Sequence, residues 1–171
     1  MKINKNIVLV GMMGAGKSSI GYLLAKKLKF KHCDIDKVIE NKTKMKIVQI
    51  FKEKGESYFR NLEEKSALQV LNKNNHIISL GGGGFLNENI REEIKKKSIS
   101  IWLDWKHKTL INRINLNKKK RPIALNLTNN KIRDLIIKRS KIYSKANYKI
   151  NCENKDKDLL TKEIIQIYEN I

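Results

Sequence analysis

Cysteine, proline and long apolar runs are all scarce in this sequence of 171 residues. The two cysteines, Cys33 and Cys152, lack the C-x-x-C or His/Cys spacing of a zinc site, which excludes disulfide-rich and zinc-stabilised small domains. No segment approaches the roughly 18 apolar residues that a membrane-spanning helix needs. We therefore expect a cytoplasmic protein without a membrane partner. With one proline and no Ser/Gly-rich linker, residues 1–171 are expected to form a single domain.

Acidic residues are also few, so the formal net charge is +20. Such a charge can indicate a nucleic-acid partner, because basic surfaces attract phosphates. However, 31 of the 37 basic residues are lysine, and the lysine runs at residues 95–97 and 118–120 lack interleaved aromatic residues. Binders of nucleic acid use aromatic residues for stacking and arginine for bidentate contacts. The charge is better explained by a compositional bias toward lysine, and we expect no nucleic-acid partner.

Short apolar runs typical of buried strands alternate with longer segments of helical period. The expected strands cover residues 7–10, 31–34, 76–80, 98–103 and 148–152. The expected helices cover residues 17–28, 47–53, 56–71, 88–97, 106–114, 131–143 and 156–168. This alternation predicts an α/β fold with a parallel sheet covered by helices on both faces. Such sheets bind ligands at the carboxyl ends of their strands, so the residues that follow each strand are candidates for the functional site.

The segment G-M-M-G-A-G-K-S at residues 11–18 matches the P-loop pattern G-x-x-x-x-G-K-[ST]. It follows a predicted strand and opens a predicted helix, as the motif requires. Its glycines allow backbone N–H groups to surround a phosphate, while Lys17 can reach the β- and γ-phosphates and Ser18 can bind Mg²⁺. The alternative, a glycine turn before a buried helix, would not need both Lys17 and Ser18. The motif predicts nucleotide binding and leaves the phosphate acceptor open.

The acceptor is expected to bind within residues 34–63, which begin with two carboxylates at the end of the second strand. Alternate strand residues share a face, so Asp34 and Asp36 are expected to point the same way. Asp34 could hold Mg²⁺ through its water shell, while Asp36 accepts the hydrogen of an attacking hydroxyl. The alternative is that Asp36 only caps a helix at residues 37–40, which is the commoner role of an aspartate in this place.

Arg60 and a run of four glycines are the next candidates for the acceptor site. Arg60 and Glu63 lie three residues apart and could form only a surface pair. Arginine is rare in this chain, however, and its planar fork matches a carboxylate. The glycines at residues 81–84 could be a flexible loop, but at the end of a strand they favour close approach of a ligand to the backbone.

The cationic segment at residues 115–124 lies between two predicted helices and is expected to form a lid. A lid arginine, Arg121, would close over the γ-phosphate and act as an arginine finger supplied by the same chain. The alternative, a solvated charged loop, explains the three lysines at residues 118–120 better than it explains Arg121, which precedes the only proline.

In order and spacing, these motifs resemble those of the shikimate kinase family. The matching features are the P-loop wording, Asp34-x-Asp36, G-E-x-x-F-R-x-x-E at residues 55–63, the glycines at residues 81–83, Arg121-Pro122, and Arg139 followed by Tyr143. They lie within residues 7–155. The resemblance implies a three-layer P-loop kinase fold of the nucleoside-monophosphate-kinase type, with a five-stranded parallel sheet and a lid. It also implies a phosphotransferase that moves the γ-phosphoryl group of ATP to the 3-hydroxyl of shikimate, in chorismate and aromatic amino acid biosynthesis.

The resemblance also implies individual roles for these residues. The implied substrate-binding residues are Arg60 and Arg139 for the carboxylate, Asp36 for the ring hydroxyls, and the backbone at Gly82 and Gly83. The implied ATP contacts are Gly14, Ala15, Gly16, Lys17, Ser18, Ser19, Arg121 and Lys155. The implied catalytic residues are Lys17, Asp36 and Arg121, and Ser18 and Asp34 would hold one Mg²⁺ per subunit.

The sequence departs from the family pattern at two places, and two alternative functions stay open. The lid has Ile123 after its proline, where the family more often has leucine, and past Tyr143 the family pattern thins, which affects Lys155. A related kinase of gluconate or of a nucleoside monophosphate is the alternative enzyme. A non-catalytic, nucleotide-dependent protein that binds nucleic acid is the alternative from another class. Nothing in the sequence demands more than a monomer.

Overall fold

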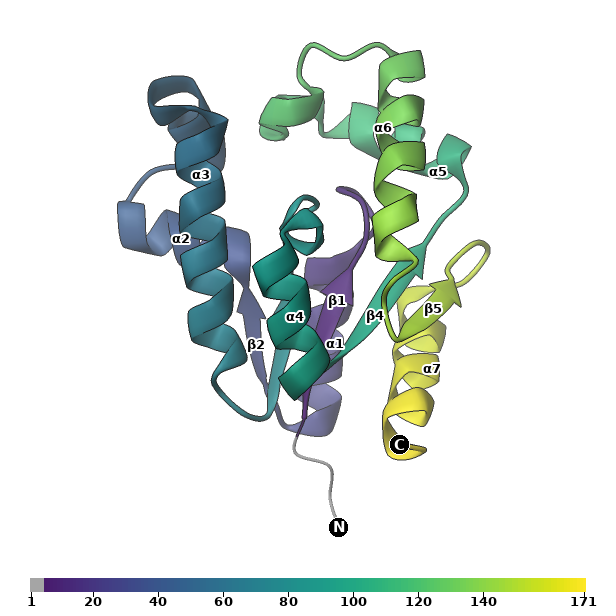
Figure 1. Ribbon diagram of the computed structural model, residues 1–171. Helices are drawn as coiled ribbons and strands as arrows, with labels where there is room; N and C mark the ends of the chain where they lie inside the picture. The colour runs from purple at the N-terminus through teal and green to yellow at the C-terminus, as the bar shows by residue number, and fades with distance from the viewer. Residues whose placement is uncertain (1–4) are drawn as a thin grey trace.

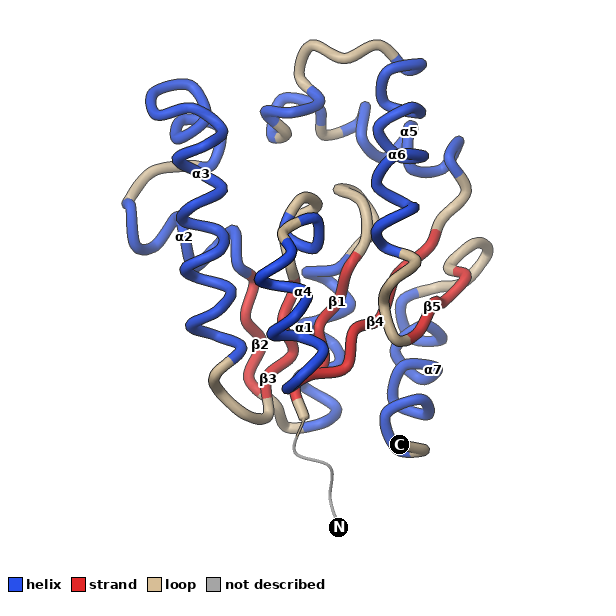
Figure 2. The backbone as a smooth tube through the Cα atoms, in the orientation of Figure 1, coloured by secondary structure: helices blue, strands red, loops and turns tan. Residues whose placement is uncertain are grey.

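A computed structural model describes residues 5–171, so the start of the predicted domain, residues 1–4, lies outside the described part of the chain. Its centre is a five-stranded parallel sheet with the strand order β2-β3-β1-β4-β5 (Figures 1 and 2). The strands are β1 (Asn6–Val10), β2 (Lys31–Asp34), β3 (His76–Ser79), β4 (Ser98–Asp104) and β5 (Tyr148–Asn151). All five predicted strands are confirmed.

The middle strands are buried on both faces, which explains why they read as continuous apolar runs. Every residue of β1 is buried, and β1 pairs with β3 on one side and β4 on the other. Ile7 is opposite Ile77 in one pair and Ile99 in the other, and all three are core residues. β1 is therefore held rigidly at the centre, and the loop that follows it starts from a fixed point.

Helices cover both faces of the sheet, as predicted. They are α1 (Lys17–Leu28), α2 (Ile35–Thr43), α3 (Ile47–Leu71), α4 (Glu88–Lys97), α5 (His107–Leu116), α6 (Asn129–Tyr143) and α7 (Lys157–Glu169). α1 and α7 pack together on one face, and α4 packs with α3 and β4 on the other (Figure 1). The core sits in these two layers between helix and sheet. No helix in the described residues is long and apolar enough to cross a membrane.

Several helices begin at polar caps that the sequence supplies. Asn87, Thr128 and Asp156 accept hydrogen bonds from the third residue beyond them, at the starts of α4, α6 and α7. Such caps satisfy N–H groups that have no partner within the helix. The cap at Thr128 is significant for the site, because it fixes where α6 begins after the lid.

Gly55 interrupts α3 and divides it into the two helices that the sequence predicts. Its backbone has φ 84° and ψ 169°, a conformation that side-chain-bearing residues rarely adopt. The part before Gly55 and the helix α2 form an arm beside the sheet, while the part after it packs on the core (Figures 1 and 2). Gly55 therefore turns the start of α3 away from the sheet.

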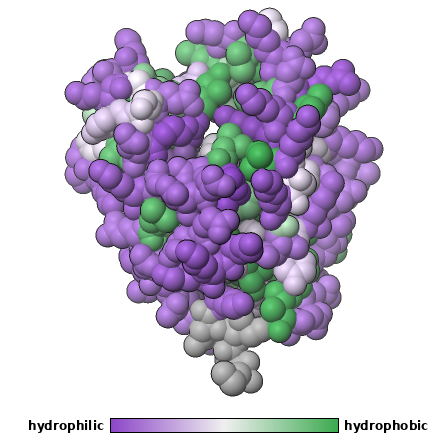
Figure 3. Space-filling view, in the orientation of Figure 1, coloured by the Kyte–Doolittle hydropathy of each residue, from purple (hydrophilic) through white to green (hydrophobic). Residues whose placement is uncertain are grey.

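The carboxyl ends of the strands lie on one side of the molecule, and three functional segments start there. The P-loop follows β1, Asp34 ends β2, and the glycine turn follows β3. The lid lies above them and consists of two short 3₁₀ helices, η2 (Lys118–Lys120) and η3 (Pro122–Ala124). In Figure 3 the viewed face is mostly hydrophilic and is hollowed between the arm and the upper right part of the molecule, which carries the lid and α6. This arrangement places the candidate site at the predicted edge of the sheet.

Candidate active site

The P-loop adopts a compact turn around the side chain of Lys17. Gly14 and Gly16 have φ values of 86° and 89°, so both positions favour glycine. The Lys17 Nζ donates to the carbonyl oxygens of Gly11 at 2.7 Å and Met12 at 2.9 Å. Burial lowers the pKa of Lys17 to about 8, against the opposing charges of Asp36 and Asp34. The ammonium group therefore lies at the phosphate-binding turn, where β- and γ-phosphate oxygens would stabilise its charge.

Two residues that the sequence analysis did not single out support the P-loop. The Trp105 Nε1 donates to the Ala15 carbonyl oxygen at 3.0 Å, and the Arg113 guanidinium lies 3.6 Å from the centre of a Trp105 ring. The signal for Arg113 was present in the sequence, because it is one of six arginines in a chain rich in lysine. Trp105 gave no such signal, since an aromatic residue after a strand reads as part of the core.

Ser18 and Asp34 meet at the end of β2, where the Ser18 hydroxyl donates to the Asp34 carboxylate. Asp34 is also the N-cap of α2, because its Oδ1 accepts from the Lys37 N–H at 3.3 Å. The alternative prediction that Asp36 is the cap is therefore wrong, since Asp36 lies inside the first turn of α2. Asp34 and Asp36 do line the same cavity. Strand alternation is not the reason, however, because Asp36 lies in α2 and not in the strand.

A hydroxyl beside a single carboxylate fits Mg²⁺ that arrives with ATP. Magnesium in phosphoryl-transfer sites is bound by one or two protein groups, by water and by phosphate oxygens. The described residues contain no cluster of three or more His, Cys, Asp or Glu side chains that could hold a metal ion by themselves. Ser18 and Asp34 therefore suit a magnesium ion shared with the nucleotide and would not make a closed protein site.

Asp36 and Glu63 approach each other at the glycine turn. The Asp36 Oδ1 and the Glu63 Oε1 are buried and have no hydrogen-bond partner among the described residues. A Cβ atom built on Gly81 would collide with both oxygens, so the missing side chain makes room for them. Burial raises the pKa of Asp36 to about 7, helped by the charges of Asp34 and Glu63, and burial also raises the pKa of Glu63. Both carboxyl groups are short of hydrogen-bond donors, which a hydroxylated ligand could supply.

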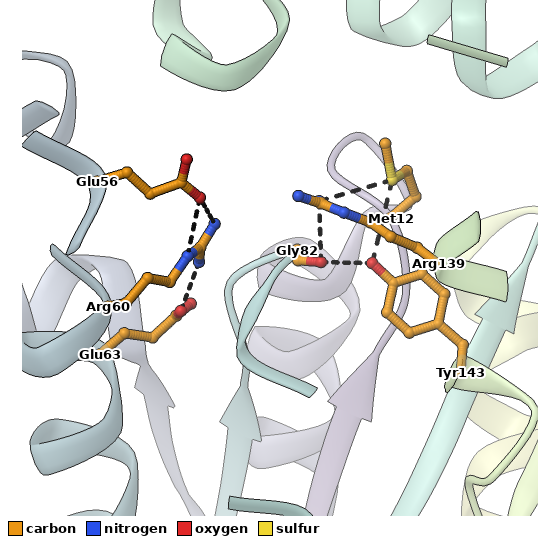
Figure 4. Close-up of polar contacts among 7 residues, drawn as sticks. All are labelled: Met12, Glu56, Arg60, Glu63, Gly82, Arg139 and Tyr143. Carbon is orange, nitrogen blue, oxygen red and sulfur yellow. Dashed lines mark hydrogen bonds and ion pairs between the residues drawn. The ribbon is translucent and has the colours of Figure 1, made fainter. Parts of the chain in front are cut away.

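Arg60 and Arg139 approach the cavity from opposite sides, with Gly82 between them (Figure 4). Arg60 is held by Glu56 at 2.9 Å and by Glu63 at 2.6 Å. Burial disfavours the charge of Arg60, but these two carboxylates outweigh it and raise the pKa of the guanidinium. The surface-pair alternative is wrong for Glu63, whose side chain is only 2% exposed.

Arg139 is 5% exposed and has no carboxylate partner within salt-bridge distance in the described residues. Its Nη1 donates to the Gly82 carbonyl oxygen at 3.1 Å and lies 3.9 Å from the Met12 sulfur. Its Nε is buried and has no partner among the described residues. A buried cation normally needs an anion, so Arg139 is poised to receive one from a ligand.

The lid brings Arg121 over the P-loop. A Cβ atom built on Gly14 would lie 3.2 Å from the Arg121 Nη1 and 3.3 Å from its Nη2. The Nη1 donates to the Arg113 carbonyl oxygen at 2.9 Å, and burial lowers the pKa of Arg121. Among the lid lysines, Lys119 lines the cavity, and Lys118 donates to the Leu127 carbonyl oxygen at 2.7 Å. The predicted lid is thus a structured cover and not a loose charged loop.

These groups surround one cavity of about 860 Å³. The predicted site residues that line it are Ser18, Asp34, Asp36, Arg60, Gly82, Gly83, Arg121 and Arg139. Gly14, Ala15, Gly16 and Lys17 belong to the P-loop beneath it, and Ser19 is exposed at the start of α1. Lys155 lies apart from it, between β5 and α7, where its Nζ pairs with Glu163 at 2.7 Å.

An apolar wall lines the same cavity; its residues lie in the expected acceptor region and lid, but the sequence analysis assigned them no role in binding. It consists of Ile47, Val48, Phe51, Phe59, Pro122 and Ile123. Phe51 and Phe59 lie on the two sides of the break at Gly55, and their rings pack with centres 4.8 Å apart and planes tilted by 42°. For the residues on α3, the sequence pattern shows only the apolar faces of two helices, because the break at Gly55 between them is a tertiary feature. A ligand here would have a carboxylate, hydroxyl groups and an apolar ring face.

Comparisons with known proteins agree with this geometry. The shikimate kinase family model matches residues 13–169. Shikimate kinases of Sulfurihydrogenibium sp. (strain YO3AOP1) and Persephonella marina are each 43% identical to this chain; the matches span 94% of this chain and 96% and 97% of those proteins. The solved structure of shikimate kinase from Acinetobacter baumannii in complex with shikimate has a TM-score of 0.92 and 31% identity, covering 99% of this chain and 95% of that one. The fold and the P-loop kinase class predicted from the sequence are confirmed, and this chain belongs to the shikimate kinase family.

Proposed function

We propose that this chain transfers the γ-phosphoryl group of ATP to the 3-hydroxyl of shikimate, forming shikimate 3-phosphate for chorismate and aromatic amino acid biosynthesis. The observation that carries this proposal is the buried Arg139, which lacks a carboxylate partner in the described residues and faces Arg60 across the cavity (Figure 4). Glu63, a buried carboxylate that also lines the cavity, already pairs with Arg60. The anion that the site lacks is the carboxylate of the substrate.

The remaining groups fit the rest of the acceptor and the reacting centre. The unpartnered oxygen of Asp36 accepts the hydrogen of the attacking hydroxyl, whose oxygen forms a bond to the γ-phosphorus as the bond to ADP breaks. Lys17 and Arg121 stabilise the charge on the transferring group. Phosphoryl transfer requires positioning and charge neutralisation more than covalent help from the protein, so these roles suffice.

We further propose that Ser18 and Asp34 hold one Mg²⁺ with the nucleotide. An ion held there would supply neutralisation of the phosphate charge. The hydrogen bond from the Ser18 hydroxyl to the Asp34 carboxylate supports this proposal, because it brings the two groups together. Ser19 and Lys155 stay as proposed ATP contacts. To contact ATP, the Lys155 ammonium group would first have to leave its ion pair with Glu163.

The enzyme is proposed to act as a cytoplasmic monomer without nucleic acid. All the groups named above come from one chain, so the site needs no second subunit to complete it. Sedimentation velocity of the purified protein, with and without polynucleotide, would test the monomeric state and the absence of nucleic-acid binding.

The direct test is ADP release by purified protein with ATP and Mg²⁺. Shikimate, gluconate and nucleoside monophosphates are added in turn, and polynucleotide serves as a separate addition. We expect only shikimate to stimulate release. Stimulation by gluconate or a nucleoside monophosphate alone would support the alternative enzyme, and stimulation by polynucleotide alone would support the nucleic-acid-binding protein.

Replacing Arg139 with lysine is expected to raise the KM for shikimate about 10- to 100-fold, because an ammonium group cannot reproduce a bidentate fork in this position. The KM for ATP should change by less than about twofold. Steady-state kinetics with each substrate varied would measure both constants. Arg133→Lys is the matched control, since Arg133 is exposed on the same helix. An unchanged KM for shikimate in Arg139→Lys would remove Arg139 from the carboxylate site.

A further inference from the structure

The glycines at residues 81–84 form a β-turn whose type can be assigned. The Gly84 N–H donates to the Gly81 carbonyl oxygen at 3.0 Å, so Gly82 and Gly83 are the two central residues. Gly83 has φ −104° and ψ −16°, and Gly82 is not one of the glycines with positive φ, so the turn is of type I and not type II or II′. Glycine in this position usually favours a type II turn, in which φ of the third residue is positive. Both types are open to this glycine, so contacts outside the turn can decide between them.

Type I and type II turns differ by a flip of the central peptide group, which here joins Gly82 to Gly83. The carbonyl oxygen of this peptide accepts two hydrogen bonds, one from the Tyr143 hydroxyl and one from the Arg139 Nη1 at 3.1 Å. Both donors come from α6, four residues apart on the same helical face (Figure 4). A flipped peptide would lose both hydrogen bonds, so these two side chains oppose the flip.

Of the two donors, Tyr143 is the one that has no other proposed partner in the site. Its side chain is 1% exposed, and its ring lies 6.1 Å from the ring of Trp102 on β4. Burial raises the pKa of Tyr143 to about 12, so the hydroxyl keeps its proton at any physiological pH. Arg139, in contrast, is also the proposed partner of the substrate carboxylate. Tyr143 can hold the Gly82 carbonyl whether or not substrate is bound.

Holding the Gly82 carbonyl also fixes the N–H of Gly83. The two groups belong to one planar trans peptide and point in opposite directions. The N–H of Gly83 therefore points away from Tyr143, and Gly83 lines the cavity. In the described part of the chain, this N–H donates to no protein acceptor. It is available to a ligand only while the peptide keeps its present orientation.

We propose that Tyr143 is a positioning residue for the acceptor, whose buried hydroxyl holds the Gly82–Gly83 peptide in the type I orientation and so aims the Gly83 N–H at the substrate. This role rests on the proposed function, because it assumes that the acceptor binds beside the glycine turn. The competing explanation is that Tyr143 only fills the core under α6. The two differ in what happens when the hydroxyl alone is removed.

The first test is the kinetics of Tyr143→Phe, which keeps the ring and removes the hydroxyl. We expect the KM for shikimate to rise about three- to tenfold, the loss of one hydrogen bond, while the KM for ATP stays within about twofold. The matched control is Tyr168→Phe. Tyr168 is also buried and also donates to a backbone carbonyl, that of Lys5 at 3.2 Å, but it lies on α7 away from the cavity. An unchanged KM for shikimate in Tyr143→Phe, or an equal rise in both variants, would overturn the proposal.

The second test observes the turn itself by NMR spectroscopy of protein labelled with ¹⁵N-glycine. The chain has nine glycines, so nine amide signals have to be assigned. In Tyr143→Phe we expect the amide signals of Gly82 and Gly83 to broaden or double, with Gly11 and Gly55 unchanged, and shikimate to restore single signals. Spectra identical to those of the wild-type protein would overturn the role of Tyr143, even if the KM had risen. If the wild-type protein shows no turnover of shikimate, the proposed function fails, whereas the substrate-free glycine spectra still decide whether Tyr143 holds the turn.

Discussion

Replacing Arg121 with alanine is expected to lower kcat about 10³-fold or more, with a much smaller change in the KM for shikimate. The reason is the place of the guanidinium, which lies directly over Gly14 of the P-loop while its backbone belongs to the lid. In that position it can neutralise charge on the γ-phosphoryl group as the bond to ADP breaks. This interaction strengthens in the transition state, so its loss falls on kcat.

Single-turnover and steady-state measurements would separate this effect from a loss of nucleotide binding. Arg121→Lys keeps a positive charge but not the fork, and it should recover part of kcat. Arg133→Ala is the control for removal of a positive charge, since Arg133 is exposed and does not line the cavity. A kcat in Arg121→Ala within tenfold of the wild-type value would show that the lid arginine only covers the site.

The strand ends explain which parts of this site the sequence could predict. The P-loop is a continuous motif between a strand and a helix, so residues 11–18 carry their own structural context. The same reasoning placed Asp34 and the glycine turn correctly, because each directly follows a buried strand. Arg60 and Arg139 are different, since 79 residues separate them. Only the family resemblance brought them together, and the structure places both at one cavity.

The details that were wrong or missed depend on contacts that periodicity does not record. Asp34, and not Asp36, caps α2 because the helix begins at the residue directly after the last residue of β2. Within the apolar wall, the contact between Phe51 and Phe59 spans the break at Gly55 in α3. The two hydrogen bonds on the Gly82 carbonyl need α6 and the glycine turn to meet across the sheet. A linear sequence gives the residue types at these places and not their contacts.

The position of Asp36 has a consequence for stability as well as for activity. Burial raises its pKa from an ordinary 3.8 to about 7, so the folded protein holds the proton more tightly than the unfolded chain does. Stability from this group is complete below pH 3.8 and is lost as the pH rises through about 7. The difference between the two pKa values corresponds to roughly 4 kcal/mol at most. The ionised form of Asp36, which the proposed function requires, therefore lowers the free energy of unfolding.

Replacing Asp36 with asparagine should therefore stabilise the protein and inactivate it. We expect kcat to fall about 10²- to 10⁴-fold, because an amide cannot accept the hydroxyl hydrogen as a carboxylate does. At pH 8 the free energy of unfolding should rise by about 1 to 3 kcal/mol, because a neutral group replaces a buried charge.

Urea unfolding of the magnesium-free proteins between pH 4 and pH 8 would measure the second effect. The advantage of Asp36→Asn over the wild-type protein should grow as the pH rises toward about 7 and then level off. Asp134→Asn, on the exposed face of α6, is the control and should change neither kcat nor the dependence on pH. If Asp36→Asn is less stable than the wild-type protein at pH 8, the carboxylate is held by favourable partners such as Lys17. The shortage of hydrogen-bond donors around Asp36 would then not be what prepares this site for its hydroxyl-bearing substrate.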